Sequence, residues 1–115
     1  NVPVVCVGAA GGRGDPTRVR IGQGLDRVAG DPLLRAVRKR LDADARAAPL
    51  AIYSEEKAQR LGDDLLKRTG CDHAFGTLAS VTAAFGLAAA KAALDLLLVA
   101  RPDAPRAAEA DDEAP

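Results

Sequence analysis

The sequence contains no methionine and begins with Asn1, so it cannot start from its own initiator unless residues have been removed. We therefore expect further residues upstream of Asn1. No basic segment precedes the apolar residues 2 to 7, which are too few for the core of a signal peptide and are interrupted by Pro3. The sequence therefore predicts no secretion signal.

Cysteine and histidine are scarce. Cys6 and Cys71 lie far apart, which argues against a disulfide framework and against a zinc site, and fits a reducing cytoplasm. The one histidine, His73, stands two residues from Cys71, just before a predicted helix whose first amides could lower the pKa of a thiol. Cys71 is therefore a candidate nucleophile, and a buried or incidental cysteine is the alternative.

The glycine-rich stretch at residues 8 to 14 lacks the residues of a nucleotide-binding loop. Glycine lets backbone amides approach a phosphate closely. A Walker loop also needs a lysine and a hydroxyl residue after its last glycine, and a dinucleotide loop needs a third glycine that opens a helix. Here Gly14 is followed by Asp15 and Pro16. The spacing argues against nucleotide binding by this loop alone.

Charge is balanced overall and uneven along the chain. Residues 1–40 carry eight basic and three acidic side chains (8 − 3 = +5), and residues 41–115 carry eight and thirteen (8 − 13 = −5). The basic part could contact phosphate, or its arginines could simply solvate helix and strand surfaces. Residues 101–115 hold three prolines and five acidic residues, and we predict a disordered tail there.

Three apolar segments predict β-strands. Residues 2 to 7 form a nearly continuous β-branched run, typical of an interior strand buried on both faces. Residues 17 to 23 alternate aliphatic and polar side chains, which predicts a strand with one exposed, cationic face. Residues 50 to 53 predict a short buried strand that ends before Glu55 and Glu56, which we expect to be solvated loop residues.

Two helices are predicted. Asp31 can cap the first free amides of a helix, and Pro32 suits the first helical position. Apolar residues then recur at helical spacing to about Ala45 beneath a basic surface. Residues 77–99 predict a long helix with no charge before Lys91.

The long predicted helix has the length to span a bilayer, but its polar residues and many alanines favour a buried helix in a soluble protein. Small residues recur in it at intervals of three or four and form a shallow stripe that a helix or a sheet can approach closely. This stripe is a candidate subunit interface, and it consists of Ala79, Ala83, Gly86, Ala90 and Ala93.

Four segments in this order carry a family resemblance: VPVVCVGAAGGRGDPTRVRI, DPLLRAVRKRL, IYSEEK and CDHAFGTLASVTAAFG. The chain resembles the C-terminal half of tRNA threonylcarbamoyladenosine dehydratases, in the ThiF/MoeB/HesA group related to ubiquitin-activating enzymes. The resemblance covers about residues 1–100. It implies an α/β fold, the C-terminal part of a Rossmann-like ThiF/MoeB-type fold, with a mixed sheet, a basic helix and a long buried C-terminal helix.

The resemblance also implies a cytoplasmic homodimer that uses ATP and Mg to activate a carboxylate on a modified adenosine of tRNA, and loses the adenylate as a ring closes. The nucleotide-binding half would lie upstream of Asn1, so we expect the ATP and Mg sites mainly there, no metal site here, and no activity from this segment alone. Cationic side chains would hold the tRNA. The candidates are Arg13, Arg18, Arg20, Arg35, Arg38, Lys39 and Arg40.

Two alternatives stay open. The parent enzyme could adenylate a sulfur-carrier or ubiquitin-like protein, in which case Cys71 would be the catalytic residue that accepts the acyl group, and a cysteine desulfurase system would be a partner. The chain could instead be a non-catalytic dimerisation module that uses residues 79–93. None of these interpretations involves a membrane.

Overall fold

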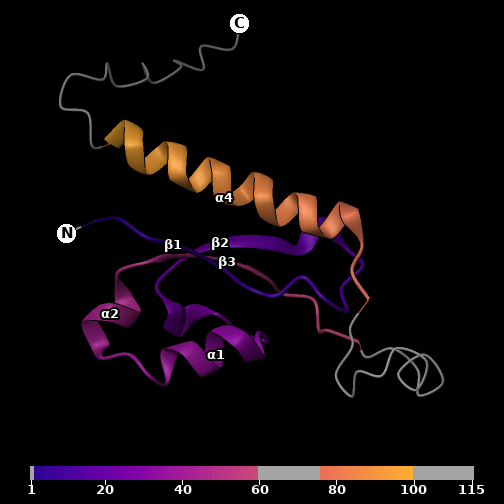
Figure 1. Cartoon of the computed structure of the whole chain (residues 1–115), viewed down its shortest axis with the longest axis horizontal. Coiled ribbons are helices and arrows are strands. Elements are labelled where there is room, and N and C mark those ends of the chain that lie inside the picture. Colours follow the sequence, from indigo (N-terminus) through magenta and orange to yellow (C-terminus); the bar gives the residue numbers. More distant parts are fainter. Residues whose placement is uncertain (1, 60–75, 100–115) are drawn as a thin grey trace, which may run out of the picture.

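The computed structural model describes residues 2–59 and 76–99. A three-stranded sheet lies at its centre, with helices on both faces (Figure 1). The strands are β1 (Val5–Val7), β2 (Val19–Gln23) and β3 (Leu50–Ser54), and their order is β1-β3-β2. The central strand pairs parallel with β1 and antiparallel with β2. The predicted α/β fold with a mixed sheet is confirmed.

Strand β1 is shorter and less buried than the sequence predicts. Its register places Val5 opposite Leu50 and Val7 opposite Ile52. Val5 and Cys6 are half-buried and Val7 is exposed. The prediction of an interior strand buried on both faces over residues 2 to 7 is wrong for this chain, because β1 is an edge strand among the described residues and Val2, Val4 and Val7 are exposed.

The other two strands follow the prediction closely. Strand β2 begins two residues later than expected because Pro16–Arg18 form a 3-10 turn, which Asp15 caps by accepting a hydrogen bond from the Thr17 amide. In β3, Ala51 and Ile52 are buried on opposite faces of the sheet, as the two-residue repeat of a strand requires. This strand therefore contributes to the packing on both sides.

The helix predicted from residue 31 to residue 45 is in fact two helices. Helix α1 (Pro32–Arg38) begins as predicted, with Asp31 as its cap. Helix α2 (Ala43–Ala47) has its own cap, because the Asp42 carboxylate accepts a hydrogen bond from the Ala45 amide at 2.8 Å. Aspartate favours such caps over helix interiors, so a new helix starts where the pattern predicts continuation.

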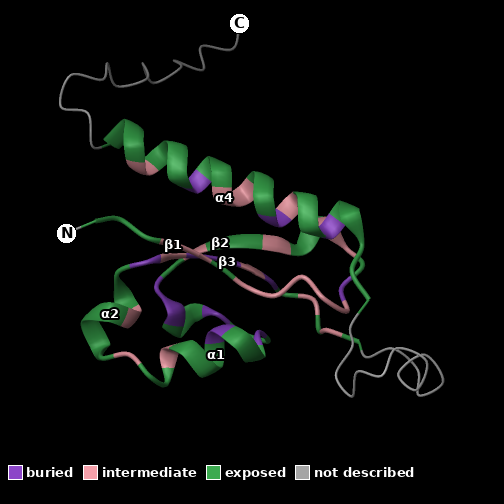
Figure 2. Cartoon of the chain, in the orientation of Figure 1, coloured by how far each residue is buried: buried purple, intermediate pink, exposed green. Residues whose placement is uncertain are grey.

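Helix α4 (Ala79–Val99) confirms the predicted long helix, but its burial differs from the prediction. It lies across one face of the sheet, and α1 and α2 lie on the other (Figure 1). Only Val81, Phe85 and Ala92 are buried, and the side turned away from the sheet is exposed (Figure 2). The prediction of a buried helix is therefore wrong for most of the surface of α4, because the sheet covers only one side of the helix.

The small-residue stripe of α4 lies outside the buried face of the helix. All five of its residues are exposed, and the buried residues of the helix are Val81, Phe85 and Ala92. In length and composition α4 is the one described helix that could cross a membrane, with a mean hydropathy of 1.7 over its most apolar window, of which 17% is buried. This test is weak evidence, since core helices of soluble proteins pass it too.

The core forms two clusters separated by the sheet. The cluster on the α1 and α2 side contains Leu25, Val28, Leu34 and Ala51. The cluster under α4 contains Ile52, Val81, Phe85 and Ala92. Burying each large side chain of these clusters stabilises the fold by about 1.5–3 kcal/mol.

Candidate functional site

The glycine-rich loop after β1 is tied to α1 by one buried carboxylate. Asp31 Oδ2 accepts a hydrogen bond from the Ala9 amide at 3.0 Å, and Asp31 Oδ1 accepts one from the Leu34 amide at 3.0 Å. Asp31 is only 1% exposed. A side chain at Gly8 would overlap the Asp31 carboxylate, so this approach of loop and helix requires glycine there.

The far end of the loop is held by a second carboxylate. Glu56 Oε2 accepts hydrogen bonds from the Asp15 amide at 2.8 Å and from the Gly14 amide at 3.1 Å, and Oε1 accepts one from Gly14 at 3.0 Å. The hydrogen bonds from the Asp15 and Gly14 amides lower the pKa of the Glu56 carboxyl below its ordinary value. Glu56 is therefore an anchor of the loop, and not the solvated residue that the sequence predicts.

These contacts decide what the loop can bind. Phosphate binding by a glycine-rich loop depends on free backbone amides directed at the anion. Here the amides of Ala9, Gly14 and Asp15 already donate to the chain's own carboxylates. These amides are therefore not available to a nucleotide phosphate, and we assign no ATP chemistry to the loop.

Arg13 occupies the centre of the loop and is buried, with 3% of its surface exposed. Its guanidinium donates to three carbonyl groups from separate segments: Nε to Glu56 at 2.9 Å, Nη2 to Gly30 at 3.0 Å, and Nη1 to Ala9. An arginine enclosed in this way cannot contact RNA at the surface. The structure therefore gives Arg13 a structural role in place of the predicted tRNA contact.

A cleft of about 350 Å³ lies where this loop meets the start of α4. Two backbone hydrogen bonds of 2.8 Å border it, from the Gly12 amide to the Gly76 carbonyl and from the Gln59 amide to the Gly12 carbonyl. Among the described residues that line it, Thr77 has the one hydroxyl group, and there is no histidine, cysteine or lysine. The lining residues are Gly12, Arg13, Gly14, Glu56, Gln59, Gly76, Thr77 and Leu78.

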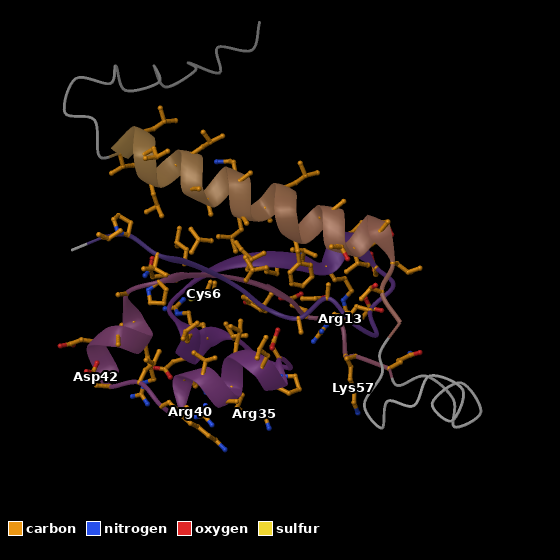
Figure 3. All side chains as sticks on the ribbon, viewed as in Figure 1. Cys6, Arg13, Arg35, Arg40, Asp42 and Lys57 are labelled. Carbon is orange, nitrogen blue, oxygen red and sulfur yellow. The ribbon has the colours of Figure 1, made fainter. Side chains whose placement is uncertain are left out.

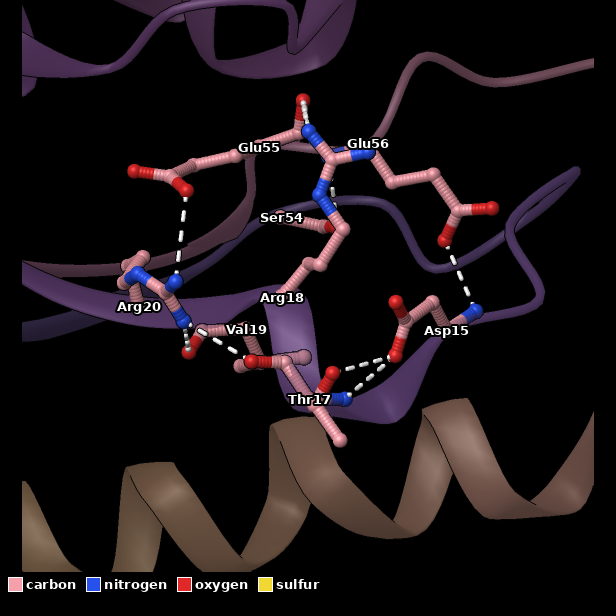
Figure 4. Close-up of polar contacts among 8 residues, drawn as sticks. All are labelled: Asp15, Thr17, Arg18, Val19, Arg20, Ser54, Glu55 and Glu56. Atoms are coloured by element: carbon pink, nitrogen blue, oxygen red, sulfur yellow. Dashed lines mark hydrogen bonds and ion pairs between the residues drawn. The ribbon is translucent and has the colours of Figure 1, made fainter.

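Arg18 and Arg20 lie beside acidic residues at the start of β2 (Figure 4). Arg20 Nη2 lies 3.4 Å from Glu55 Oε2, and both side chains are nearly half exposed. Arg18 Nη2 donates to the Glu55 carbonyl at 3.3 Å. Asp15 is close by, and hydrogen bonds from Thr17 lower the pKa of its carboxyl. Arg20 therefore has a carboxylate partner, and Arg18 is tied to the same residue through its backbone carbonyl.

The remaining predicted cations gather around α1, on the opposite side of the sheet from α4. Arg35 and Lys39 are exposed, and Arg38 is half-buried and reaches the Asp26 carbonyl at 3.5 Å. Arg40 follows the helix and is also exposed. Figure 3 shows Arg35 and Arg40 pointing from α1 away from the sheet. The structure thus separates the predicted tRNA-binding set into three groups: Arg13 in the loop, Arg18 and Arg20 at the start of β2, and the cations around α1.

The candidate nucleophile Cys71 and its neighbour His73 lie outside the described residues, so the prediction for them stays a prediction. Cys6 is a free, half-buried cysteine on β1. Within the described ranges, no group of three or more histidine, cysteine, aspartate or glutamate side chains could hold a metal ion.

Sequence reasoning missed the anchors of the loop. It identified Asp31 as a helix cap but not as the acceptor for Ala9, and it assigned Glu56 to solvent. One signal in the sequence pointed to Arg13. The glycines on either side of it, Gly12 and Gly14, leave room for its side chain to fold back against the loop. The carboxylate partners could not be found, because they stand 22 and about 40 residues away in the sequence.

The fold is similar to that of the tRNA N6-threonylcarbamoyladenosine dehydratase of E. coli, TcdA. Against its AMP complex the TM-score is 0.69 with 27% sequence identity, covering 85% of this chain and 39% of that chain. Against its ATP complex the TM-score is 0.65 with 26% identity, covering 85% and 38%. A further structure of TcdA, also named CsdL, matches with a TM-score of 0.69 and 26% identity.

The resemblance predicted from the sequence is therefore confirmed by structures. The chain spans about two fifths of the length of these solved proteins. No family model and no curated protein matches the sequence.

Proposed function

We propose that this chain, which shares the fold of part of a tRNA N6-threonylcarbamoyladenosine dehydratase, is the C-terminal part of a cytoplasmic, homodimeric enzyme that modifies tRNA. The enzyme would use ATP and Mg to convert a carboxylate on the modified adenosine into an acyl adenylate, releasing pyrophosphate. Ring closure onto the activated carbon would then expel AMP, so that the net change is loss of water.

The structural likeness carries this proposal. It extends over 85% of the chain, and the similar enzymes were solved with AMP and with ATP. A carboxylate is a poor electrophile until its oxygen is joined to a phosphoryl leaving group, which is the chemistry that ATP supplies.

The described residues support a division of labour in this enzyme. Asp31 and Glu56 occupy backbone amides at both ends of the glycine-rich loop, which argues against a phosphate site there. We therefore propose that the nucleotide is bound by a Rossmann-like segment outside this chain, and that this chain supplies a scaffold for it and a surface for RNA.

The test is an ATP-dependent dehydration assay on tRNA that carries threonylcarbamoyladenosine, with the loss of one water followed by mass spectrometry. Two proteins are compared: the 115-residue chain, and a polypeptide that carries it together with any upstream GxGGxG segment its gene encodes. We expect turnover from the longer protein and none from the chain alone. ATP–pyrophosphate exchange that depends on a sulfur-carrier protein and is unaffected by tRNA would overturn the proposal.

Replacement of Cys71 distinguishes direct ring closure from transfer through a thioester. Ring closure needs no thiol, so Cys71→Ala should retain near-full dehydration activity in the longer protein. Loss of activity would favour the alternative function, in which an acyl group or sulfur passes through a cysteine. Cys6→Ala is the matched control, because Cys6 lies on β1 and has no part in either mechanism.

A further inference from the structure

The cations around α1 are exposed or half-buried and form no ion pair within the part of the chain that the structure describes, whereas Arg13 is buried and Arg20 pairs with Glu55. Among the described residues, ion pairs join Arg20 to Glu55, Arg46 to Asp26 and Lys91 to Asp95. None involves the four cations of what we term the α1 basic surface, which consists of Arg35, Arg38, Lys39 and Arg40.

We propose that the α1 basic surface binds the phosphate backbone of double-stranded RNA and does not read its bases. The proposal rests on the proposed function for the identity of the nucleic acid, since the similar enzymes act on tRNA. Release of counterions from phosphates is the main driving force for such binding, and it requires cations that are not already paired.

The arrangement of the surface suits a backbone contact. Arg35, Arg38 and Lys39 stand at positions i, i+3 and i+4 of a helical turn, so their side chains leave neighbouring parts of one helix surface. Arg40 extends the group into the turn after the helix, and its side chain points away from the sheet, as that of Arg35 does (Figure 3).

The acidic residues nearest to this surface do not cancel it. Asp26 pairs with Arg46 at 3.6 Å. The Asp42 carboxylate accepts a hydrogen bond from the Ala45 amide as the cap of α2. Asp44 is exposed on α2 and pairs with none of the four cations. The net charge of the α1 basic surface therefore stays positive.

The surface lacks the side chains that read unpaired bases. Recognition of single-stranded RNA depends on aromatic rings on which bases stack. Of the aromatic residues that the structure describes, Phe85 is buried under α4 and Tyr53 packs against the core cluster beneath the sheet. With cations and no exposed ring, α1 can recognise the shape and charge of a helical stem, and selection of the modified adenosine must come from elsewhere.

Fluorescence anisotropy on the 115-residue chain tests this assignment. The probes are a labelled unmodified tRNA transcript and a labelled RNA duplex of unrelated sequence, each titrated over a range of salt. Arg35, Arg38, Lys39 and Arg40 are replaced together by glutamine. The matched control carries Arg18→Gln and Arg20→Gln, which removes two cations that lie against Glu55. Circular dichroism establishes that both variants are folded.

We expect the wild-type chain to bind both RNAs with similar affinity. Removing four phosphate contacts should reduce the slope of log K against log salt by about 3–4 and weaken binding at least about tenfold, whereas the control should stay within about twofold of wild type. Unchanged binding by the fourfold variant, an equal loss in the control, or preferential binding to vesicles of anionic phospholipid would overturn the assignment.

The dehydration assay keeps this test separate from that of the proposed function. If the chain binds RNA through α1 but the longer protein does not dehydrate tRNA, the RNA-binding role of the α1 basic surface is supported and the proposed function is rejected. Dehydration that survives the fourfold substitution with an unchanged KM for tRNA would reject the surface alone.

Discussion

The two faces of the sheet are covered in opposite ways. On one face a single long helix, α4, buries three side chains and leaves exposed leucines on its outer surface, such as Leu87 and Leu94. On the other face two short helices begin at aspartate caps, and α1 turns cations to the outside. The comparison teaches that α4 depends on apolar burial, whereas α1 combines the apolar contact of Leu34 with the polar anchor Asp31.

The largest effect should come from removing an apolar contact beneath α4. Phe85 is 3% exposed and Leu94 on the same helix is 57% exposed. We expect Phe85→Ala to lower the free energy of unfolding by about 3–4 kcal/mol through lost burial and a residual cavity, and Leu94→Ala to change it by less than about 0.5 kcal/mol. Urea unfolding followed by circular dichroism measures both, and equal effects would show that α4 does not rest on the sheet as described.

On the opposite face, replacement of a polar residue should also lower the free energy of unfolding. Asp31→Ala removes the cap of α1 and leaves the buried amides of Ala9 and Leu34 without acceptors, which should lower the free energy of unfolding by about 2–3 kcal/mol. Asp42→Ala removes an exposed cap of α2 and should lower it by about 1 kcal/mol. The same urea titrations compare the two, and a cost for Asp42→Ala as large as that for Asp31→Ala would contradict the double role of Asp31.

The smallest expected effect concerns pH. Hydrogen bonds lower the pKa of Glu56 in the folded protein below its ordinary value of 4.5, so its contribution to stability is present above that value and is lost as the pH falls through the lowered pKa. Glu56→Gln cannot titrate, and its melting temperature should fall less between about pH 5 and pH 3 than that of the wild type. Glu55→Gln is the control, and identical pH profiles for Glu56→Gln and wild type would remove Glu56 from the list of loop anchors.

Local signals in the sequence predict the elements well. The pair Asp31 and Pro32 predicts the start of α1, the alternation after Thr17 predicts β2, and the absence of charge before Lys91 predicts α4. Each depends on residues a few positions apart, where capping and side-chain periodicity act directly.

Apart from the division between α1 and α2, which the local cap Asp42 causes, the errors share one physical cause, which is that burial and pairing depend on distant segments. An apolar run cannot show whether a strand covers its edge, so β1 was predicted to be interior. Composition also could not show that Arg13 is enclosed by carbonyls of Ala9, Gly30 and Glu56, whereas the cations of α1 form no ion pair among the described residues. The candidate site could therefore be predicted as a set of residue types but not as an arrangement.

The strand order has a consequence for how the chain folds during synthesis. The outer strands β1 and β2 each pair with β3 and not with each other, and β3 follows both of them in the sequence. When residues 5 to 23 leave the ribosome, neither strand has its partner, whereas α1 and α2 can form from contacts close in sequence. Assembly of this sheet must therefore wait until β3 has emerged, and both pairings close over long sequence separations, which favours slow assembly and leaves strand edges open to other chains until it is complete.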